Sequence, residues 1–103
     1  NDEDGIHFGL WLDTELVSVI SLFIEGQEAQ FRKFATLEHL QGRGFGSALL
    51  GHLIDFSKKH KVQLLWCHAR TSALPFYQKF GLDAVGDTFA KEGIEYVKME
   101  IQL

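Results

Sequence analysis

A glycine-rich segment, at which the hydrophobic pattern changes its period, constrains the fold of this chain more than any other feature. Residues 29–36, before it, are predicted to form a strand, and apolar residues after it recur at helical spacing through about residue 59. Glycines stand between these patterns at positions 42, 44 and 46. Because glycine has no Cβ, the backbone N–H groups there are accessible, and at a helix start they are unpaired and lie at the positive dipole end. The segment is therefore predicted to bind an anion such as a pyrophosphate, with Arg43 adding a cation at its rim.

Spacing narrows the choice among phosphate-binding loops. A Walker loop is excluded because the chain has no Gly-Lys-Ser or Gly-Lys-Thr sequence. A dinucleotide-binding fingerprint fits poorly, because Ser47 and Leu49 stand where a third glycine is needed. The alternative to ligand binding is a structural turn whose glycines only let the helix pack on the sheet.

The whole chain is predicted to form six strands and two helices. The strand after the first helix is expected to run parallel to the strand before it, because a helix crosses between them. Phe31 and Phe34 lie three residues apart, which does not suit one face of a regular strand, so a bulge is expected there. Ser72 is the expected N-cap of the second helix and Gly81 its terminator. The elements are expected over residues 6–12, 16–23, 29–36, 44–59, 62–68, 72–80, 84–89 and 96–101, and the first helix is expected to bury Phe45, Ala48, Leu49, Leu53 and Phe56.

Composition limits the class of protein. A chain of 103 residues with 46% hydrophobic residues can bury one core, so residues 1–103 are expected to form a single domain. A net charge of -4 argues against a nucleic acid partner, and no apolar run reaches the roughly 20 residues of a membrane-spanning helix. Cys67 is the single cysteine, which excludes an intrachain disulfide and argues against a cysteine-based zinc site. A cytoplasmic protein that needs no metal is expected.

Two motifs resemble those of a known family. The segment Gln41-x-x-Gly44-x-Gly46 resembles the Gln/Arg-x-x-Gly-x-Gly/Ala signature of the GNAT acetyltransferases. The segment from Ala73 to Leu82, with Phe76-Tyr77 at its centre, resembles their second signature. The resemblance runs from the first hairpin to the last strand. It implies an α/β (α+β) fold with a mixed, mostly antiparallel sheet, and transfer of an acetyl group from acetyl-coenzyme A (acetyl-CoA) to a primary amine of a small molecule or peptide by direct attack in a ternary complex.

The resemblance also implies a cofactor site. Backbone groups near residues 34–36 would pair with the pantetheine arm, and amides of residues 41–46 would hold the pyrophosphate, in a gap between two splayed parallel strands. Many family members have Asn where this chain has Arg70, which could instead reach a cofactor phosphate or an acidic substrate group. The expected cofactor-binding residues are Phe34, Ala35, Thr36, Gln41, Gly42, Arg43, Gly44, Phe45, Gly46, Ser47, Arg70, Ala73 and Phe76.

The sequence leaves alternatives open for each catalytic role. Tyr77 matches the family's tyrosine that protonates the departing thiolate, and its alternative role is to pack the second helix on the core. The candidates for the base that accepts a proton from the amine are His68, Glu28, Glu25 and His39, and a water chain could replace any of them. Cys67 is expected to fill the core, because neighbouring residues of a strand point to opposite faces and it cannot pair with His68.

The chain also departs from the family pattern. Family members normally open with a strand and two helices that cover the sheet, and nothing in this sequence corresponds to them. The first hairpin is therefore expected to expose apolar side chains such as Trp11 unless another chain covers them, a homodimer being one arrangement. The alternatives to an acetyltransferase are a non-catalytic module that binds coenzyme A as a regulatory ligand, and a transferase of longer acyl groups.

Overall fold

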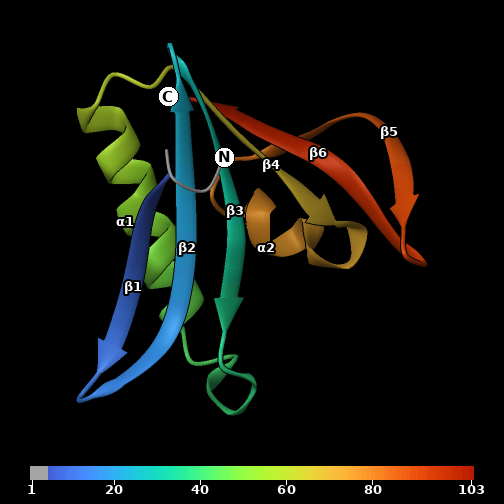
Figure 1. Cartoon of the computed structure of the whole chain (residues 1–103). Coiled ribbons are helices and arrows are strands. Elements are labelled where there is room, and N and C mark those ends of the chain that lie inside the picture. The colour runs from blue at the N-terminus through green and yellow to red at the C-terminus, as the bar shows by residue number, and fades with distance from the viewer. Residues whose placement is uncertain (1–4) are drawn as a thin grey trace.

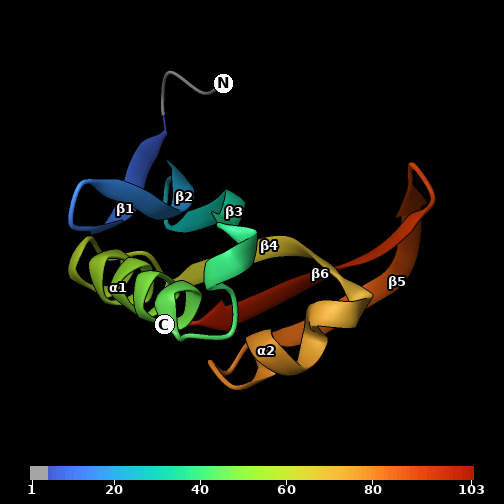
Figure 2. The ribbon, with the colours of Figure 1, turned by 90° about the horizontal axis from the view of Figure 1, so that it is seen from below.

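The protein is built on one sheet of six strands in the order β1-β2-β3-β4-β6-β5 (Figure 1). The computed structural model describes residues 5–103. Figure 2 shows that both α-helices lie on the same side of this sheet. The strands are β1 Ile6–Leu12, β2 Glu15–Glu25, β3 Glu28–Thr36, β4 Leu64–Arg70, β5 Asp83–Lys91 and β6 Ile94–Gln102, and the helices are α1 Phe45–Lys59 and α2 Leu74–Gln78, with 3₁₀ turns at Glu38–Leu40 and Thr71–Ala73.

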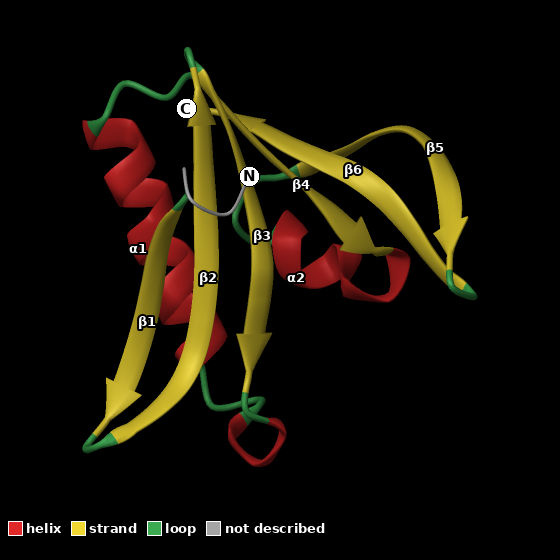
Figure 3. Cartoon of the chain, in the orientation of Figure 1, coloured by secondary structure: helices red, strands yellow, loops and turns green. Residues whose placement is uncertain are grey.

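The central pair of strands, β3 and β4, is the parallel pair, and the other neighbours are antiparallel. This confirms the predicted mixed, mostly antiparallel sheet and the predicted order of elements. Residues Glu28 to Gln30 of β3 pair with Leu64 to Trp66 of β4. Beyond these three pairs the strands diverge, as Figure 3 shows, so the sheet is open at their carboxyl ends.

A β-bulge in β3 also interrupts the regular pairing of the sheet. Val19 of β2 pairs with Ala35, but Ser21 pairs with Arg32, so β3 carries one extra residue between these pairs. Lys33 has a φ of 57°, in the left-handed region that a side-chain-bearing residue seldom adopts. The bulge confirms the prediction drawn from the odd phenylalanine spacing. It turns Phe34 onto the same face as Phe31, and their ring centroids are 6.4 Å apart.

Helix α1 covers the core with a wider face than the sequence suggested. It buries Leu49, Leu50, Leu53, Ile54 and Ser57, whereas Ala48 is exposed and Phe45 and Phe56 are half-buried. The predicted stripe was wrong at Ala48, whereas Phe56 is partly buried and packs against the core. The buried face also includes Leu50 and Ile54, because α1 packs against several strands and so needs a broad apolar arc. The buried hydroxyl of Ser57 donates to the carbonyl of Leu53 at 2.8 Å, which satisfies it.

Helix α2 is shorter than predicted. Thr71–Ala73 forms a 3₁₀ turn, the α-helix begins at Leu74, and Ser72 provides no cap, because Pro75 in the first turn sets the helix start. Gly81 terminates the helical segment as predicted, with a φ of 93° and its N–H donating to the carbonyl of Gln78 at 3.0 Å. A Cβ at Gly81 would lie 3.0 Å from Cδ1 of Ile101, so a side chain there would also require Ile101 to shift.

The face of the sheet opposite the helices carries exposed apolar side chains. Trp11 of β1 is 62% exposed, and Leu16, its partner in β2, is also exposed, which confirms the expectation for the first hairpin. Neither helix of the described residues is long and apolar enough to cross a membrane.

Candidate cofactor-binding cleft

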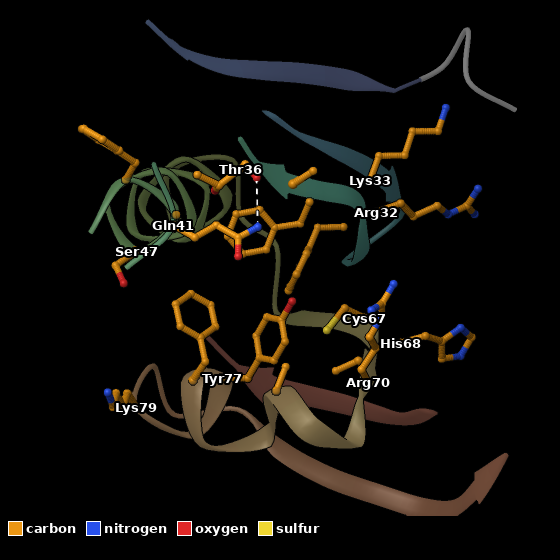
Figure 4. Close-up of a pocket in the computed structure, with 18 of the residues that line it drawn as sticks. Arg32, Lys33, Thr36, Gln41, Ser47, Cys67, His68, Arg70, Tyr77 and Lys79 are labelled. Carbon is orange, nitrogen blue, oxygen red and sulfur yellow. Dashed lines mark hydrogen bonds between the residues drawn. The ribbon is translucent and has the colours of Figure 1, made fainter. Parts of the chain in front are cut away.

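A cleft of about 950 Å³ opens where β3 and β4 diverge (Figure 4). Because the two strands run in the same direction and share only three pairs, the cleft lies at their carboxyl ends, and the start of α1 and helix α2 flank it. The structure brings together fourteen of the residues predicted from the sequence at this cleft, namely Phe34, Ala35, Thr36, Gln41, Gly42, Gly44, Phe45, Gly46, Ser47, His68, Arg70, Ala73, Phe76 and Tyr77.

The edge of β3 that faces the cleft has no partner strand. Pairing with β4 ends at Gln30, while pairing of β3 with β2 on its other side continues to Thr36. Backbone groups of residues 31–36 that point toward β4 are therefore outside the ladder between these strands. Such an edge can pair with the amides of an extended ligand, as an added strand would.

The other wall of the cleft is the start of α1. Gly44 is the N-cap residue, with a φ of 86°, and no side chain caps this helix end. The first bond of the helix runs from the N–H of Ala48 to the carbonyl of Gly44 at 3.0 Å, so the N–H groups of Phe45, Gly46 and Ser47 precede the helical ladder. A Cβ at Gly42 or Gly44 would have nothing within 4 Å. The helix start therefore offers N–H donors toward open space, as an anion site requires.

Hydrogen bonds to β2 and β3 hold this loop in place. The side-chain amide of Gln41 donates to the carbonyl of Thr36 at 3.2 Å, and the N–H of Leu37 donates to the carbonyl of Val17 at 2.9 Å. The buried hydroxyl of Ser18 donates to the carbonyl of Ala35 at 3.1 Å and lies 2.9 Å from the hydroxyl oxygen of Thr36. These contacts fix the loop before any ligand arrives. Gln41, predicted from the sequence as a cofactor ligand, thus has a positioning contact.

Gly46 is required for a different reason from Gly44. A Cβ at this position would lie 3.3 Å from the ring of Phe34 and 3.3 Å from the hydroxyl oxygen of Thr36. Both contacts are tighter than side chains ordinarily allow. Gly46 therefore permits close packing of α1 on β3, which was the structural alternative considered for the whole glycine segment.

Tyr77 lies at the centre of the cleft. Its ring packs against Phe31 and Phe34 at centroid distances of 6.0 and 6.5 Å, and its hydroxyl points into the gap between the strands (Figure 4). Burial, with a smaller effect from Cys67, raises the pKa of the Tyr77 phenol well above its ordinary value. The phenol is therefore protonated throughout the physiological range and can donate a hydrogen bond into the gap.

Cys67 and His68 point to opposite faces of β4. Cys67 is buried, and burial raises the pKa of its thiol to about 12, so it is an inert core residue as expected. His68 lies on the helix-free face, with its ring 5.2 Å from Trp66 and 5.0 Å from Phe89. Burial, then the charges of Lys98, Arg32 and Lys91, lower the pKa of His68 below its ordinary value. The imidazole is therefore neutral at neutral pH and able to accept a proton.

Several predicted residues are not brought to the cleft. Glu28 starts β3, pairs with Glu25, and lines a separate shallow hollow with Gln27 and Gln63. Six residues of strand, about 20 Å, separate Glu28 from Phe34, so the prediction of Glu28 as a base is corrected by its position, and the same holds for Glu25. His39 and Arg43 are exposed and do not line the cleft.

The cleft also contains residues that sequence reasoning missed. Lys79 lines it at the end where Ser47 lies, and a cation two residues after Tyr77 was the available signal (Figure 4). Arg32 lines the other end and could have been found only from the bulge that follows it. Tyr96 reaches the cleft because β6 pairs it with Arg70, a register that the sequence does not encode locally.

A sheet split at its parallel pair, with an uncapped helix start and a phenol at the gap, defines this chain as an acetyltransferase-type α/β fold. The chain belongs to the GNAT acetyltransferase family, because the family model described as the acetyltransferase (GNAT) domain matches residues 1–103. This confirms the resemblance drawn from the two motifs.

One curated relative and two solved structures agree with this assignment. The [ribosomal protein bS18]-alanine N-acetyltransferase of Haemophilus influenzae is 43% identical over 60 residues, which are 56% of this chain and 41% of the relative, so the match spans less than half of that protein. The ribosomal-protein-S18-alanine N-acetyltransferase of Escherichia coli has a TM-score of 0.87 at 23% identity, covering 99% of this chain and 71% of its own. A Bacillus subtilis acetyltransferase in complex with CoA has a TM-score of 0.81 at 24% identity, covering 98% and 78%. At these identities the two structures establish the fold.

Proposed function

We propose that this protein is an N-acetyltransferase that binds acetyl-CoA in the cleft and transfers the acetyl group to a primary amine by direct attack in a ternary complex. The observation that carries the proposal is the meeting of three features in one cleft: the open edge of β3, the uncapped start of α1 and the hydroxyl of Tyr77. The relative that acts on an alanine, and the neighbour in complex with CoA, support the same assignment.

The residues of the cleft suit the chemical parts of acetyl-CoA. The N–H groups of Phe45, Gly46 and Ser47 would bind the pyrophosphate, and the ammonium of Lys79 would add a positive charge beside them. The backbone of residues 34–36 would pair with the pantetheine amides. These interactions orient a long, flexible molecule along the gap, so that its thioester comes to Tyr77.

Acetyl-CoA supplies an activated acyl carbon, onto which the amine nitrogen forms a C–N bond while the C–S bond breaks. Tyr77 would give its proton to the departing sulfur, and its hydrogen bond would stabilise the negative charge that develops there. The phenol of Tyr77 is protonated at neutral pH, and the apolar surroundings of Phe31 and Phe34 strengthen its hydrogen bond to the sulfur. Burial also raises the pKa of Tyr77 and so makes it a weaker acid, which places more of its effect on the hydrogen bond than on early proton transfer.

The amine must lose a proton before or during attack. His68 lines the same cleft from β4, and its lowered pKa keeps it neutral, so it would accept that proton directly or through water. Glu28 and Glu25 lie at the far end of β3, and His39 is outside the cleft, which leaves His68 and a water chain as the candidates.

The acceptor is a primary amine of a small molecule or a peptide. The H. influenzae relative, which acts on the alanine of a ribosomal protein, favours a peptide amine for this chain as well. We retain the expectation of a cytoplasmic setting, in which a reduced Cys67 is the ordinary state.

The test combines calorimetry with acetyl-CoA and a turnover assay on a panel of amines. Tyr77→Phe should lower kcat by roughly 10²-fold and leave the dissociation constant of acetyl-CoA within about twofold, because the ring and its packing remain. Tyr96→Phe removes the other tyrosine hydroxyl that lines the cleft and is the matched control, with kcat expected within about threefold of the parent.

Three outcomes would change the assignment. An unchanged kcat for Tyr77→Phe would remove the acid role of the phenol. Binding of CoA without turnover on any amine would favour a regulatory module. Stronger binding of a longer acyl thioester than of acetyl-CoA in a competition assay would favour a different acyl donor.

A further inference from the structure

A cluster of cations surrounds His68 on the helix-free face of the sheet. We define this cationic patch as Arg32 of β3, Lys91 of β5 and Lys98 of β6. Strand pairing explains why they gather: Lys98 is directly opposite His68, and Arg32 lines the cleft from the far side of the gap. All three act on the charge state of His68. Figure 4 shows Arg32 and His68 pointing toward the same end of the cleft.

Arg32 and Lys98 of the cationic patch contact neutral groups. The Nε of Arg32 donates to the side-chain oxygen of Gln30 at 3.0 Å, and its guanidinium lies 4.5 Å from the ring centroid of Phe23. The ammonium of Lys98 lies 4.7 Å from the ring centroid of Trp66. Within residues 5–103, neither Arg32 nor Lys98 forms an ion pair with a carboxylate. Their positive charge is therefore available to a ligand.

Two carboxylates of the β4–β6–β5 ladder, those of Glu100 and Asp83, lie toward the closed end of the cleft. Glu100 is opposite Trp66 in the β4–β6 ladder, and Asp83 is opposite Glu100 in the β5–β6 ladder. Lys98 lies between Glu100 and the mouth of the cleft along β6. The sign of charge thus changes along the face, although the chain as a whole carries a net charge of -4. Because the chain as a whole is acidic, a local positive field is not a general property of its surface. Such a field indicates that the site selects a negatively charged ligand.

This field sets a condition on the acceptor. At neutral pH a primary amine is an ammonium ion, and cations beside His68 would repel it. The repulsion is offset if the acceptor carries a negative group that contacts those cations while its amine lies near His68. The same field favours loss of the ammonium proton once the acceptor is bound, because it destabilises the charged form.

Aromatic side chains complete the surface. Phe89 is 40% exposed and stacks on Tyr96, with centroids 5.8 Å apart, and its ring also contacts the edge of His68. Trp66 also meets His68 edge to face, so these rings form an aromatic cluster beside the cationic patch. Such a cluster suits the non-polar part of an acceptor whose charged groups are at its ends.

We propose that the acceptor carries a carboxylate close to its amine, as in an amino acid or the amino terminus of an acidic peptide, and that Arg32 and Lys98 bind this carboxylate. The inference rests on the proposed acetyltransferase function and adds the charge class of its substrate.

The experiment compares acceptors of different charge, with aspartate and asparagine as the pair of nearly equal size. Three peptide amides begin with alanine and carry aspartate, asparagine or lysine at the second position, and glycine is compared with glycinamide as the small-molecule arm. The kcat/KM of the aspartate peptide should exceed that of the asparagine peptide by about fivefold to tenfold, with the lysine peptide lowest. Raising the salt from about 20 to about 200 mM should reduce this preference.

Variants of the cationic patch separate charge selection from general damage. Lys98→Gln and Arg32→Gln should each reduce the preference for aspartate by about threefold without changing the affinity for acetyl-CoA. Lys98→Gln should also move the pH profile of kcat/KM to higher pH, since it removes a charge that lowers the pKa of His68. The matched control is Lys58→Gln, which removes an exposed lysine in the last turn of α1, away from the cleft.

The outcomes separate this inference from the proposed function. Acetylation of all peptides at equal rates, or a preference that survives in both variants, would overturn the charge selection and leave the acetyltransferase intact. An absence of acetyl-CoA binding, or of acetylation of any amine in the set, would overturn both. Preference for glycine over glycinamide, together with poor use of every peptide, would support the inference and assign a small-molecule acceptor.

Discussion

Substitution of Gly44 by alanine tests the anion site with a control that the chain itself provides. Gly44 has a φ of 86° and lines the cleft, and a Cβ added there would meet no atom of the protein within 4 Å. Gly26, in the turn between β2 and β3, has a φ of 63° and is equally open, but it lies at the opposite end of β3. The two positions therefore share conformational strain and differ in their distance from the cleft.

At both positions alanine would destabilise the folded state through the same backbone strain. A side chain in the left-handed region costs about 1–2 kcal/mol, so Gly44→Ala and Gly26→Ala should each lower the midpoint of thermal unfolding by several degrees, at roughly 4–8 °C per kcal/mol for a chain of this size. The methyl group at Gly44 also projects toward the ligand. If it displaces a phosphate oxygen from one N–H of the helix start, the loss of one charge-assisted hydrogen bond, about 1.5–3 kcal/mol, weakens binding at least about tenfold.

The assay pairs calorimetric titration with thermal unfolding of the three proteins. Gly44→Ala should bind acetyl-CoA at least about tenfold more weakly than the parent, and Gly26→Ala should bind it equally well despite a similar loss of stability. Equal affinity in Gly44→Ala would refute the assignment of the pyrophosphate to this loop. Weaker binding in both variants would show that affinity follows global stability rather than local geometry.

Two further predictions follow from the charge states on β4. Because the pKa of His68 is lowered from 6.5, kcat/KM measured below the pKa of the amine should rise with pH through an inflection below 6.5 and then level off. His68→Gln should remove this inflection. An unchanged profile in that variant would assign the role of base to water. Because burial raises the pKa of Cys67 to about 12, iodoacetamide at pH near 8 should label the folded protein only slowly and the guanidinium-unfolded chain rapidly, as followed by mass spectrometry, and full labelling of the folded protein would contradict the burial.

Local sequence patterns predicted most of the fold. The alternation in β6 and the change of period at Gly44 are signals within a few residues, and the structure confirms both elements. The bulge was also visible, because Phe31 and Phe34 can share a face only if one residue is inserted between them. The predictions failed where burial depends on which elements pack together. Ala48 has an apolar side chain, but it is exposed because it faces away from the sheet.

The residues of the candidate site also fall into those predicted from local motifs and those that only the tertiary structure places. Gly44 and Tyr77 were predicted because the motifs that contain them are continuous in sequence, and the structure brings both to one cleft. Glu28 was one of several candidate bases, but its pairing with Leu64 holds it at the closed end of the strands. Tyr96 and Arg32 were missed because strand pairing and a bulge, not a motif, bring them to the cleft.

The sequence alone determined the order of strands and helices, the glycines that leave a helix start accessible, and the phenol that lies beyond them. These are properties of short segments, because backbone conformation and hydrophobic period depend on nearby residues. The tertiary structure alone decided where the parallel strands diverge, that Gln41 holds the loop, and that Lys98 lies opposite His68. Contacts between segments far apart in the chain depend on the register of the sheet, and no short stretch of sequence specifies that register.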